Sequence, residues 1–230
     1  MTRTATEPRI PLSRERVLQA AVKLADEGGI AALTMRRLAE ELGAEAMSLY
    51  YHVANKEQVL DGIVDGIAEE INEAASQLTL PSQGAAWKKA ARRRILAARE
   101  ALLRHPWAPA VFGTRTNTSM AVLRYYDGLI GIMRDGGFSN DLVHHAMHAL
   151  GSRALGFSQE LFSPGDGPTT GEPDPAVVAM ADQLPNLIGM LQEVAHDDPD
   201  STLGWCDDQT EFEFGLDLLL DGLDRLIGPR

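Results

Sequence analysis

Residues 34–56, TMRRLAEELGAEAMSLYYHVANK, constrain the fold of this chain more than any other stretch. Thr34 is a good N-cap, because its hydroxyl can accept a hydrogen bond from an unpaired N–H in the first helical turn. Leu38 and Leu42 follow at the spacing of one apolar helix face, and Gly43 tolerates the left-handed backbone that ends such a helix. The pattern therefore predicts a short helix that stops at a tight glycine turn.

A second short helix is predicted to begin near residues 44–45, directly after the turn. Leu49 and Val53 lie four residues apart and should face the core. Asn55, with Gln58 three residues later, predicts the N-terminus of the next helix through an arrangement like a capping box. Two helices joined by a glycine-containing turn of about 3–4 residues match a helix-turn-helix unit.

The preceding segment predicts a supporting helix that begins after Ser13 and ends at Gly28-Gly29. Its buried stripe is expected to consist of Val17, Leu18, Ala21, Leu24 and Ala25. The chain is thus predicted to contain a flexible arm over residues 1–11, a three-helix DNA-binding domain over 12–60, and a larger domain over 61–230.

The larger domain also has a helical pattern, with no convincing strand and no repeat. Its first helix is predicted from the apolar stripe Val59, Leu60, Ile63, Val64, Ile67 and Ile71. Further helices are expected over residues 85–104, 117–134, 141–161, 177–194 and 211–227, with loops over 163–175 and 196–202. The predicted fold class is all-α.

Four segments carry a resemblance to a known family. They are LTMRRLAEELGAEAMSLYYHVANKEQVLDGI with its L-Y-x-H-V-x-N-K core, HPWAPAVFGTR (residues 105–115), RDGGFS (134–139) and FEFGLDLLLDGLDRLI (212–227). Over nearly the whole chain, this resembles the tetracycline-repressor (TetR) family of one-component regulators, and most closely the branch of the tetracycline repressor itself. The resemblance implies a homodimer, held by a four-helix bundle, that binds a palindromic operator and is released by a small-molecule inducer. A DNA-binding activator, or a regulator without a small ligand, is the alternative.

The second helix of such a motif lies in the major groove, with its N-terminal part against base edges. The expected base readers are Ala46, Met47 and Ser48, and the resemblance favours a base contact for Arg36 as well. The expected phosphate contacts are Thr34, Tyr50, His52 and Lys56, with Tyr51 beside them. For Tyr51, a role in buttressing the domain is an equally good interpretation.

The net charge of −12 is unevenly distributed. Residues 1–60 hold 8 Lys and Arg and 8 Asp and Glu, whereas the rest of the chain holds 13 and 25. The first 60 residues, which comprise the arm and the proposed DNA-binding domain, are therefore neutral together, and local charge governs phosphate contact. A basic run on residues 88–99 is expected to form one helix face that pairs with the acidic body, and a nucleic-acid role is the alternative.

Several other classes are not supported. Nucleophile elbows, phosphate loops and dinucleotide motifs are missing, so an enzyme is not expected. Cys206 is the single cysteine, which excludes an intramolecular disulfide and offers no zinc cluster. No cofactor or metal is expected; His144 and His148 share a helix face without further ligands. Without a membrane-spanning apolar run or a signal-peptide h-region, we expect a cytoplasmic protein with no membrane contact.

Two segments are candidates for the dimer surface. The helix over 211–227 has a wide apolar face, and the helix over 141–161 has small residues that permit close approach. These sets are Phe212, Leu216, Leu219, Leu220, Leu223 and Ile227, and Ala146, Ala149, Gly151 and Gly156. Intramolecular core is an equally good interpretation of any one of the leucines.

An inducer pocket is expected within the larger domain, because the resemblance implies one. The candidate lining residues are Trp107, Phe112, Thr114, Arg115, Met120, Tyr125, Met133 and Met180. Ordinary core is the alternative for the Met and Phe residues. The resemblance places Val111 where tetracycline repressors have a magnesium-coordinating histidine, Asn72 at another drug-contacting histidine, and Glu160 at a matching acidic position. Because valine cannot ligate magnesium, we predict that magnesium-tetracycline is not recognised in that manner.

Overall fold

The computed structural model describes residues 11–77, 80–115, 119–156, 183–186 and 208–228. These residues contain helices and no strand, which confirms the all-α class. The chain falls into two compact units, one of residues 1–147 with 227–230 and one of residues 148–226. The predicted arm lies almost wholly outside the described residues.

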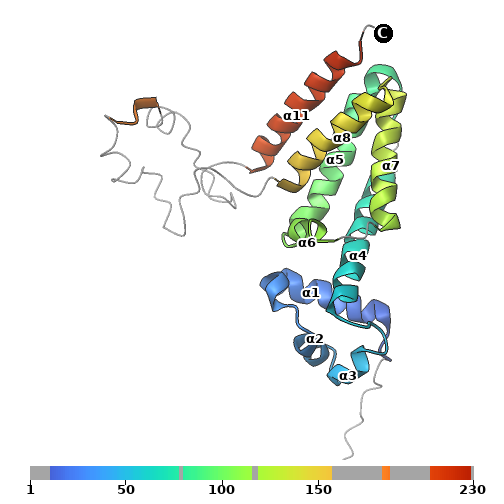
Figure 1. Cartoon of the computed structure of the whole chain (residues 1–230), viewed down its shortest axis with the longest axis vertical. Coiled ribbons are helices and arrows are strands. Elements are labelled where there is room, and N and C mark those ends of the chain that lie inside the picture. The colour runs from blue at the N-terminus through green and yellow to red at the C-terminus, as the bar shows by residue number, and fades with distance from the viewer. Residues whose placement is uncertain (1–10, 78–79, 116–118, 157–182, 187–207, 229–230) are drawn as a thin grey trace, which may run out of the picture. The chain divides into compact units, whose positions relative to one another are not determined.

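Three helices form the N-terminal module. They are α1 (Arg14–Ala32), α2 (Met35–Glu41) and α3 (Ala46–Leu49) (Figure 1). Ser13 and Thr34 cap α1 and α2 as predicted, because each side chain accepts a hydrogen bond from the backbone N–H three residues later. Gly43 has a φ of 59°, so the turn between α2 and α3 uses the left-handed conformation expected of a glycine there.

The first helix is longer than predicted. It does not end at Gly28-Gly29 but continues to Ala32 across a kink at Gly29, where φ is 69° and ψ is 171°. A glycine adopts this conformation without a steric penalty, so the chain bends there and resumes a helical path. Leu33 then closes the segment, since its backbone N–H donates to the Ile30 carbonyl.

The next helix, α4 (Lys56–Ser76), begins at the predicted cap. The Asn55 side chain accepts from the Gln58 backbone N–H at 2.9 Å, and the Gln58 side chain accepts from the Ala54 backbone N–H at 2.8 Å. In a strict capping box the Gln58 side chain would accept from the N–H of the cap residue Asn55, whereas here it accepts from the N–H of the residue before it. The whole predicted apolar stripe of α4 is buried, from Val59 to Ile71.

Four more helices follow, of which the last is divided between the two units. They are α5 (Trp87–Arg104), preceded by the 3₁₀ turn η1 (Gly84–Ala86), then α6 (Ala108–Phe112), α7 (Met120–Asp135) and α8 (Asn140–Gly156). Helix α4 packs against α1, α5, α6 and α7. One hydrophobic core runs from Leu24 of α1 through Ile63 of α4 to Val111 of α6. The three-helix module and the helices α4–α6 therefore share buried surface, and the predicted division at residue 60 stays a prediction.

Helix α5 corrects the prediction that the basic run on residues 88–99 forms one helix face. Arg99 is buried, and the Arg94 guanidinium lies 4.9 Å from the centre of the Tyr125 ring. Arg94 Nη2 also donates to the Tyr125 carbonyl at 3.1 Å. The basic run is thus divided between the interior and the surface, because consecutive residues of a helix point to different sides.

The second unit contains the remaining part of α8 and α11 (Asp208–Leu226). On α11, Phe212, Leu216, Leu220 and Leu223 of the candidate dimer surface are buried within the chain itself, which favours the intramolecular-core interpretation for these four side chains. Phe214, Leu218 and Leu226 are exposed. Most of the predicted helix over residues 177–194 lies outside the described residues, as do both predicted loops.

Candidate nucleic-acid interface

The surface around α3 consists of exposed side chains above two buried anchors. Leu49 and Val53 are inside the core, as predicted. The residues that precede and follow Leu49 point outward: Ala46 is exposed, Met47 is 70% exposed and Tyr51 is 90% exposed. Large apolar groups rarely stay this accessible without a reason when they cluster. The anchors fix the backbone, and the outer side chains are free to meet another surface.

Other predicted contacts of this surface are partly covered. Tyr50 is exposed, whereas Ser48, His52 and Lys56 are half-buried. Lys56 is the first residue of α4, the end at which backbone N–H groups carry partial positive charge. A phosphate is the kind of group that such a helix start attracts.

Two further predicted contacts lie at the start of α2. The Thr34 hydroxyl accepts the capping hydrogen bond from Arg37 and still has its own O–H to donate. Arg36 is exposed, and its Nε donates to Glu40 Oε1 at 2.9 Å. An exposed pair of this kind is worth about 0–1 kcal/mol, so the guanidinium can exchange Glu40 for a stronger anionic or purine partner.

The residues predicted to line an inducer pocket differ in their surroundings: Trp107 belongs to one hydrophobic cluster, and Phe112 and Tyr125 pack against it. Met133 is fully buried, Trp107 is buried, and Phe112 packs half-buried against the core. Met120 is 70% exposed, and the Thr114 hydroxyl donates to the Val111 carbonyl. Met180 lies outside the described residues.

Two of these residues are held by specific partners. Arg115 Nη1 donates to Glu57 Oε2 at 2.7 Å and to Asp61 Oδ1 at 3.3 Å, which ties the end of α6 to the start of α4. The hydrogen bond with Glu57 is the main reason that the pKa of Arg115 is raised. Burial raises the pKa of Tyr125 to about 12, although Arg94 beside it acts in the opposite direction.

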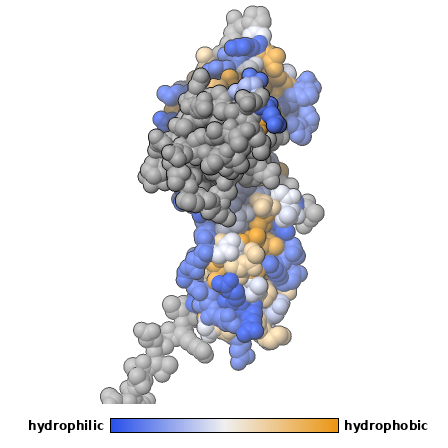
Figure 2. Space-filling view, turned by 90° about the vertical axis from the view of Figure 1, so that its left-hand side faces the viewer, coloured by the Kyte–Doolittle hydropathy of each residue, from blue (hydrophilic) through white to orange (hydrophobic). Residues whose placement is uncertain are grey.

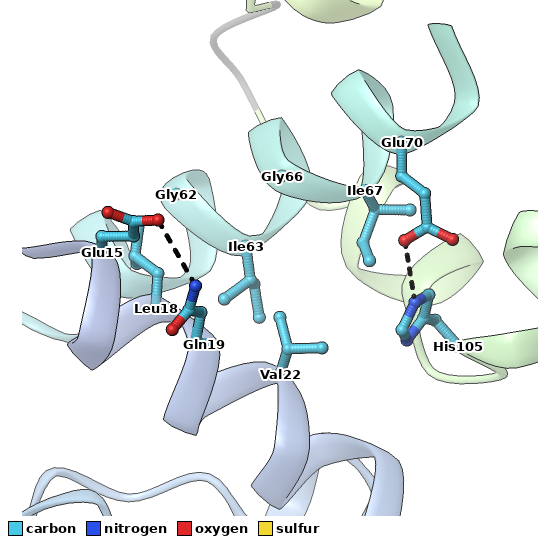
Figure 3. Close-up of a pocket in the computed structure, with 10 residues that line it drawn as sticks. All are labelled: Glu15, Leu18, Gln19, Val22, Gly62, Ile63, Gly66, Ile67, Glu70 and His105. Atoms are coloured by element: carbon cyan, nitrogen blue, oxygen red, sulfur yellow. Dashed lines mark hydrogen bonds and ion pairs between the residues drawn. The ribbon is translucent and has the colours of Figure 1, made fainter. Parts of the chain in front are cut away.

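A groove of about 380 Å³ lies between α1 and α4 (Figure 3). Gly62 permits the close approach of these helices, because a Cβ there would lie 2.6 Å from Leu18 Cδ2. The groove is lined by Glu15, Leu18, Gln19, Val22, Gly62, Ile63, Gly66, Ile67, Glu70 and His105. No predicted inducer contact is among them. Hydrophobic side chains also reach the surface among hydrophilic ones in the space-filling view (Figure 2).

One polar cluster was missed by the sequence reasoning. We call Asp26, Glu70, Arg104, His105 and Trp107 the junction cluster, because it joins α1, α4, α5 and the segment before α6. His105 Nδ1 lies 2.7 Å from Asp26 Oδ1, and Trp107 Nε1 donates to the same oxygen at 2.6 Å. These partners are 79 and 81 residues apart in the chain, so no local pattern could have revealed them.

The positions that bear on magnesium-tetracycline have structural roles where they are described. Asn72 Nδ2 donates to the Ala121 carbonyl at 2.7 Å, and Val111 is buried in the core. Glu160 lies outside the described residues. Within the described ranges, no three His, Cys, Asp or Glu side chains group as a metal site, and no helix is long and apolar enough to cross a membrane.

Two family models match the chain. Residues 17–63 match the model described as bacterial regulatory proteins, tetR family, and residues 80–227 match the tetracyclin repressor-like C-terminal domain. The tetracycline repressor protein class D of Escherichia coli is 36% identical over 149 residues, which is 63% of this chain and 64% of that repressor. The chain thus spans less than two thirds of that relative.

Two other similarities extend over almost the whole chain. The transcriptional repressor DrrR1 of Streptomyces coeruleorubidus is 29% identical and covers 99% of this chain and 83% of its own. A crystal structure of a possible TetR family transcriptional regulator from Streptomyces coelicolor has a TM-score of 0.72 and 31% identity. That alignment covers 93% of this chain and 100% of the other.

Proposed function

Because the chain belongs to the tetracycline-repressor family of bacterial DNA-binding regulators, we propose that it binds a palindromic operator as a homodimer, represses transcription and is released by a small-molecule inducer. Family membership confirms the predicted resemblance, the predicted class of DNA-binding regulator, and the prediction that the protein is not an enzyme. The exposed surface around α3, over buried Leu49 and Val53, is the observation that carries the proposal.

The chemistry of this surface supports distinct roles for its side chains. Ser48 offers a hydroxyl to base edges, and Ala46 and Met47 offer apolar contact to a thymine methyl. Arg36 supplies a planar donor fork for guanine or phosphate. The remaining proposed contacts are to phosphates, which fix register: Thr34, Tyr50, Tyr51, His52 and Lys56.

A twofold operator requires two copies of the module, so we place the dimer contact on α8 and α11. The exposed Phe214, Leu218 and Leu226 of α11 provide apolar surface, and the half-buried Ala149 of α8 allows close helix packing. Two helices from each subunit would then form the four-helix bundle. Such a dimer would act in the cytoplasm, where the operator is.

The inducer is proposed to bind in the helical body. Relatives named tetracycline repressors support a ligand-responsive function. The eight candidate contacts, from Trp107 to Met180, remain the proposed lining, and three of them, Trp107, Phe112 and Tyr125, lie in or against one hydrophobic cluster. A ligand can shift the regulator only by its difference in affinity for the two conformations. Because Val111 cannot bind magnesium, calorimetry should show no tight magnesium-dependent tetracycline binding.

Fluorescence anisotropy with DNA from upstream of the protein's own gene tests the DNA-binding proposal. Arg36→Ala should weaken binding by the equivalent of about 1–3 kcal/mol, and Lys56→Ala should weaken it similarly on all sequences while lowering the salt dependence. Arg37→Ala is the matched control, since it removes the same charge from the next exposed residue. Circular dichroism verifies folding. If both test variants keep wild-type affinity, the assigned surface is wrong.

The same assay tests the regulatory part of the proposal. A metabolite extract should release the labelled DNA from the wild-type protein if a small molecule is the inducer. If the extract still releases the DNA after it has been heated and passed through a small-pore membrane, its active component is a small molecule. Persistent binding across extracts from different growth conditions would favour the ligand-independent regulator instead.

A further inference from the structure

We propose that Asp26 is a positioning residue for operator binding, through which the body of the protein sets the orientation of the three-helix module. The inference rests on the proposed function and deepens it, because it names the side chains that link α1 to α4 and α5. It concerns the junction cluster alone and requires no knowledge of the inducer.

The first argument is the convergence of two ring donors on one carboxylate oxygen. Trp107 Nε1 and His105 Nδ1 lie 2.6 and 2.7 Å from Asp26 Oδ1, and both donors precede or begin α6. The two aromatic rings contact each other edge to face, with centroids 5.9 Å apart. Rigid rings have few rotamers to lose, so they hold the carboxylate in a defined place rather than over a range of places.

The second argument is that the cluster continues into the body. His105 Nε2 lies 3.3 Å from Glu70 Oε2 on α4 (Figure 3), and Arg104 Nε at the end of α5 donates to Glu70 Oε1 at 3.0 Å. The His105 side chain is only 11% exposed. A chain of polar contacts therefore runs from α1 through His105 to α4 and α5, and partial burial strengthens the contacts of His105 relative to water, whereas the contact between Arg104 and Glu70 is exposed.

The third argument is that the junction cluster fixes the orientation of α1, which hydrophobic packing alone does not do. The core between α1 and α4 is hydrophobic, and apolar attraction has no preferred direction. Hydrogen bonds weaken steeply when their angles change, so the junction cluster is the directional part of this contact. Leu38 of α2 and Leu49 of α3 lie in the same core as α1, so the module should follow α1 as one body.

Both ring nitrogens of His105 face carboxylates, Asp26 from α1 at Nδ1 and Glu70 from α4 at Nε2. Arg104 from α5 binds the same Glu70. The ring of His105 therefore joins the carboxylate of α1 to two helices of the body.

Half-site spacing provides the test. The affinity of the full-length protein is measured for its operator and for the same operator with one base pair inserted between the half-sites. The wild type should prefer one spacing, and Asp26→Asn should reduce that preference by about tenfold, the factor that 1.4 kcal/mol represents. Glu27→Gln is the matched control, because it makes the same charge change on the next, exposed residue and should keep the preference.

Two further variants distinguish positioning from loss of stability. Trp107→Phe keeps an aromatic side chain but removes the Nε1 donor to Asp26, so it should reduce the spacing preference as Asp26→Asn does. His105→Asn keeps a donor for Asp26, so it should retain more of the spacing preference than Asp26→Asn does. Urea unfolding of all variants shows whether a lower affinity reflects unfolding.

The outcomes separate this inference from the proposed function. If Asp26→Asn lowers affinity for both spacings equally, or changes neither, Asp26 is not a positioning residue although the protein binds DNA. If the wild type binds neither DNA, the proposed function itself fails.

Discussion

The two faces of the three-helix module are built on opposite principles. The face around α3 exposes Met47 and Tyr51. Among its proposed DNA-binding residues, Arg36 forms an exposed ion pair with Glu40. The face toward α4 and α5 contains a shared hydrophobic core and the junction cluster. Side chains on the first face can be replaced with little loss in the free energy of unfolding, whereas those on the second face fix the position of the module against α4 and α5. Sequence specificity and regulation can therefore evolve on separate sides of one small unit.

Truncation of one side chain on each face gives the largest expected contrast. Leu49→Ala should lower the free energy of unfolding by about 2–5 kcal/mol, because it removes a fully buried side chain and leaves a cavity. Met47→Ala, two residues earlier, should change it by no more than about 0.5 kcal/mol. Urea denaturation followed by circular dichroism measures both. Similar losses in the two variants would show that the faces do not differ as described.

A pair of double-mutant cycles gives a smaller contrast. Asp26→Ala with Trp107→Phe should show a coupling energy within the range of about 0.5–3 kcal/mol expected of residues in one hydrogen-bonded network. Arg36→Ala with Glu40→Ala, on the DNA-facing side, should show about 0.3–0.5 kcal/mol, as exposed helix pairs do. Both cycles are read from urea unfolding. Equal coupling energies would contradict the distinction between a directional face and an adaptable one.

The smallest contrast concerns tyrosines and appears only at alkaline pH. Tyr51 is exposed, whereas burial raises the pKa of Tyr125 to about 12. The unfolded chain loses this proton near the ordinary value of about 10, so unfolding releases a proton between pH 10 and 12, and stability contributed by neutral Tyr125 falls as pH rises through that window. Ultraviolet titration should show a late ionisation that Tyr125→Phe removes. Tyr51→Phe should leave that late step in place.

Local chemistry made the module predictable from its residues. Ser13, Thr34 and Asn55 each bond a backbone N–H three positions later, so the signal and its structural effect lie within one helical turn. Gly43 likewise has the left-handed conformation that its position implied. The kink at Gly29 shows the limit of such signals, because a glycine that can end a helix can also bend one.

Long-range pairing made the rest unpredictable. His105 precedes Pro106 and reads locally as the end of a helix, yet its partners are Asp26 and Glu70. Arg99 belongs to a basic run that suggests solvent exposure, but the packing of α5 places it inside. Arg115 was predicted to contact the inducer, but in the structure it forms ion pairs with Glu57 and Asp61. In each case the deciding neighbour comes from a distant segment.

The hydrogen bond from Trp107 to Asp26 gives the protein its own optical reporter. Indole emission responds to a nearby carboxylate, and this indole is bonded to α1 across the junction, whereas Trp87 lies edge-on to Phe138 in an apolar setting. With Trp87 and Trp205 replaced by phenylalanine, emission from the single remaining indole would follow the contact in real time. Candidate inducers could then be screened by fluorescence alone, before any operator sequence is known.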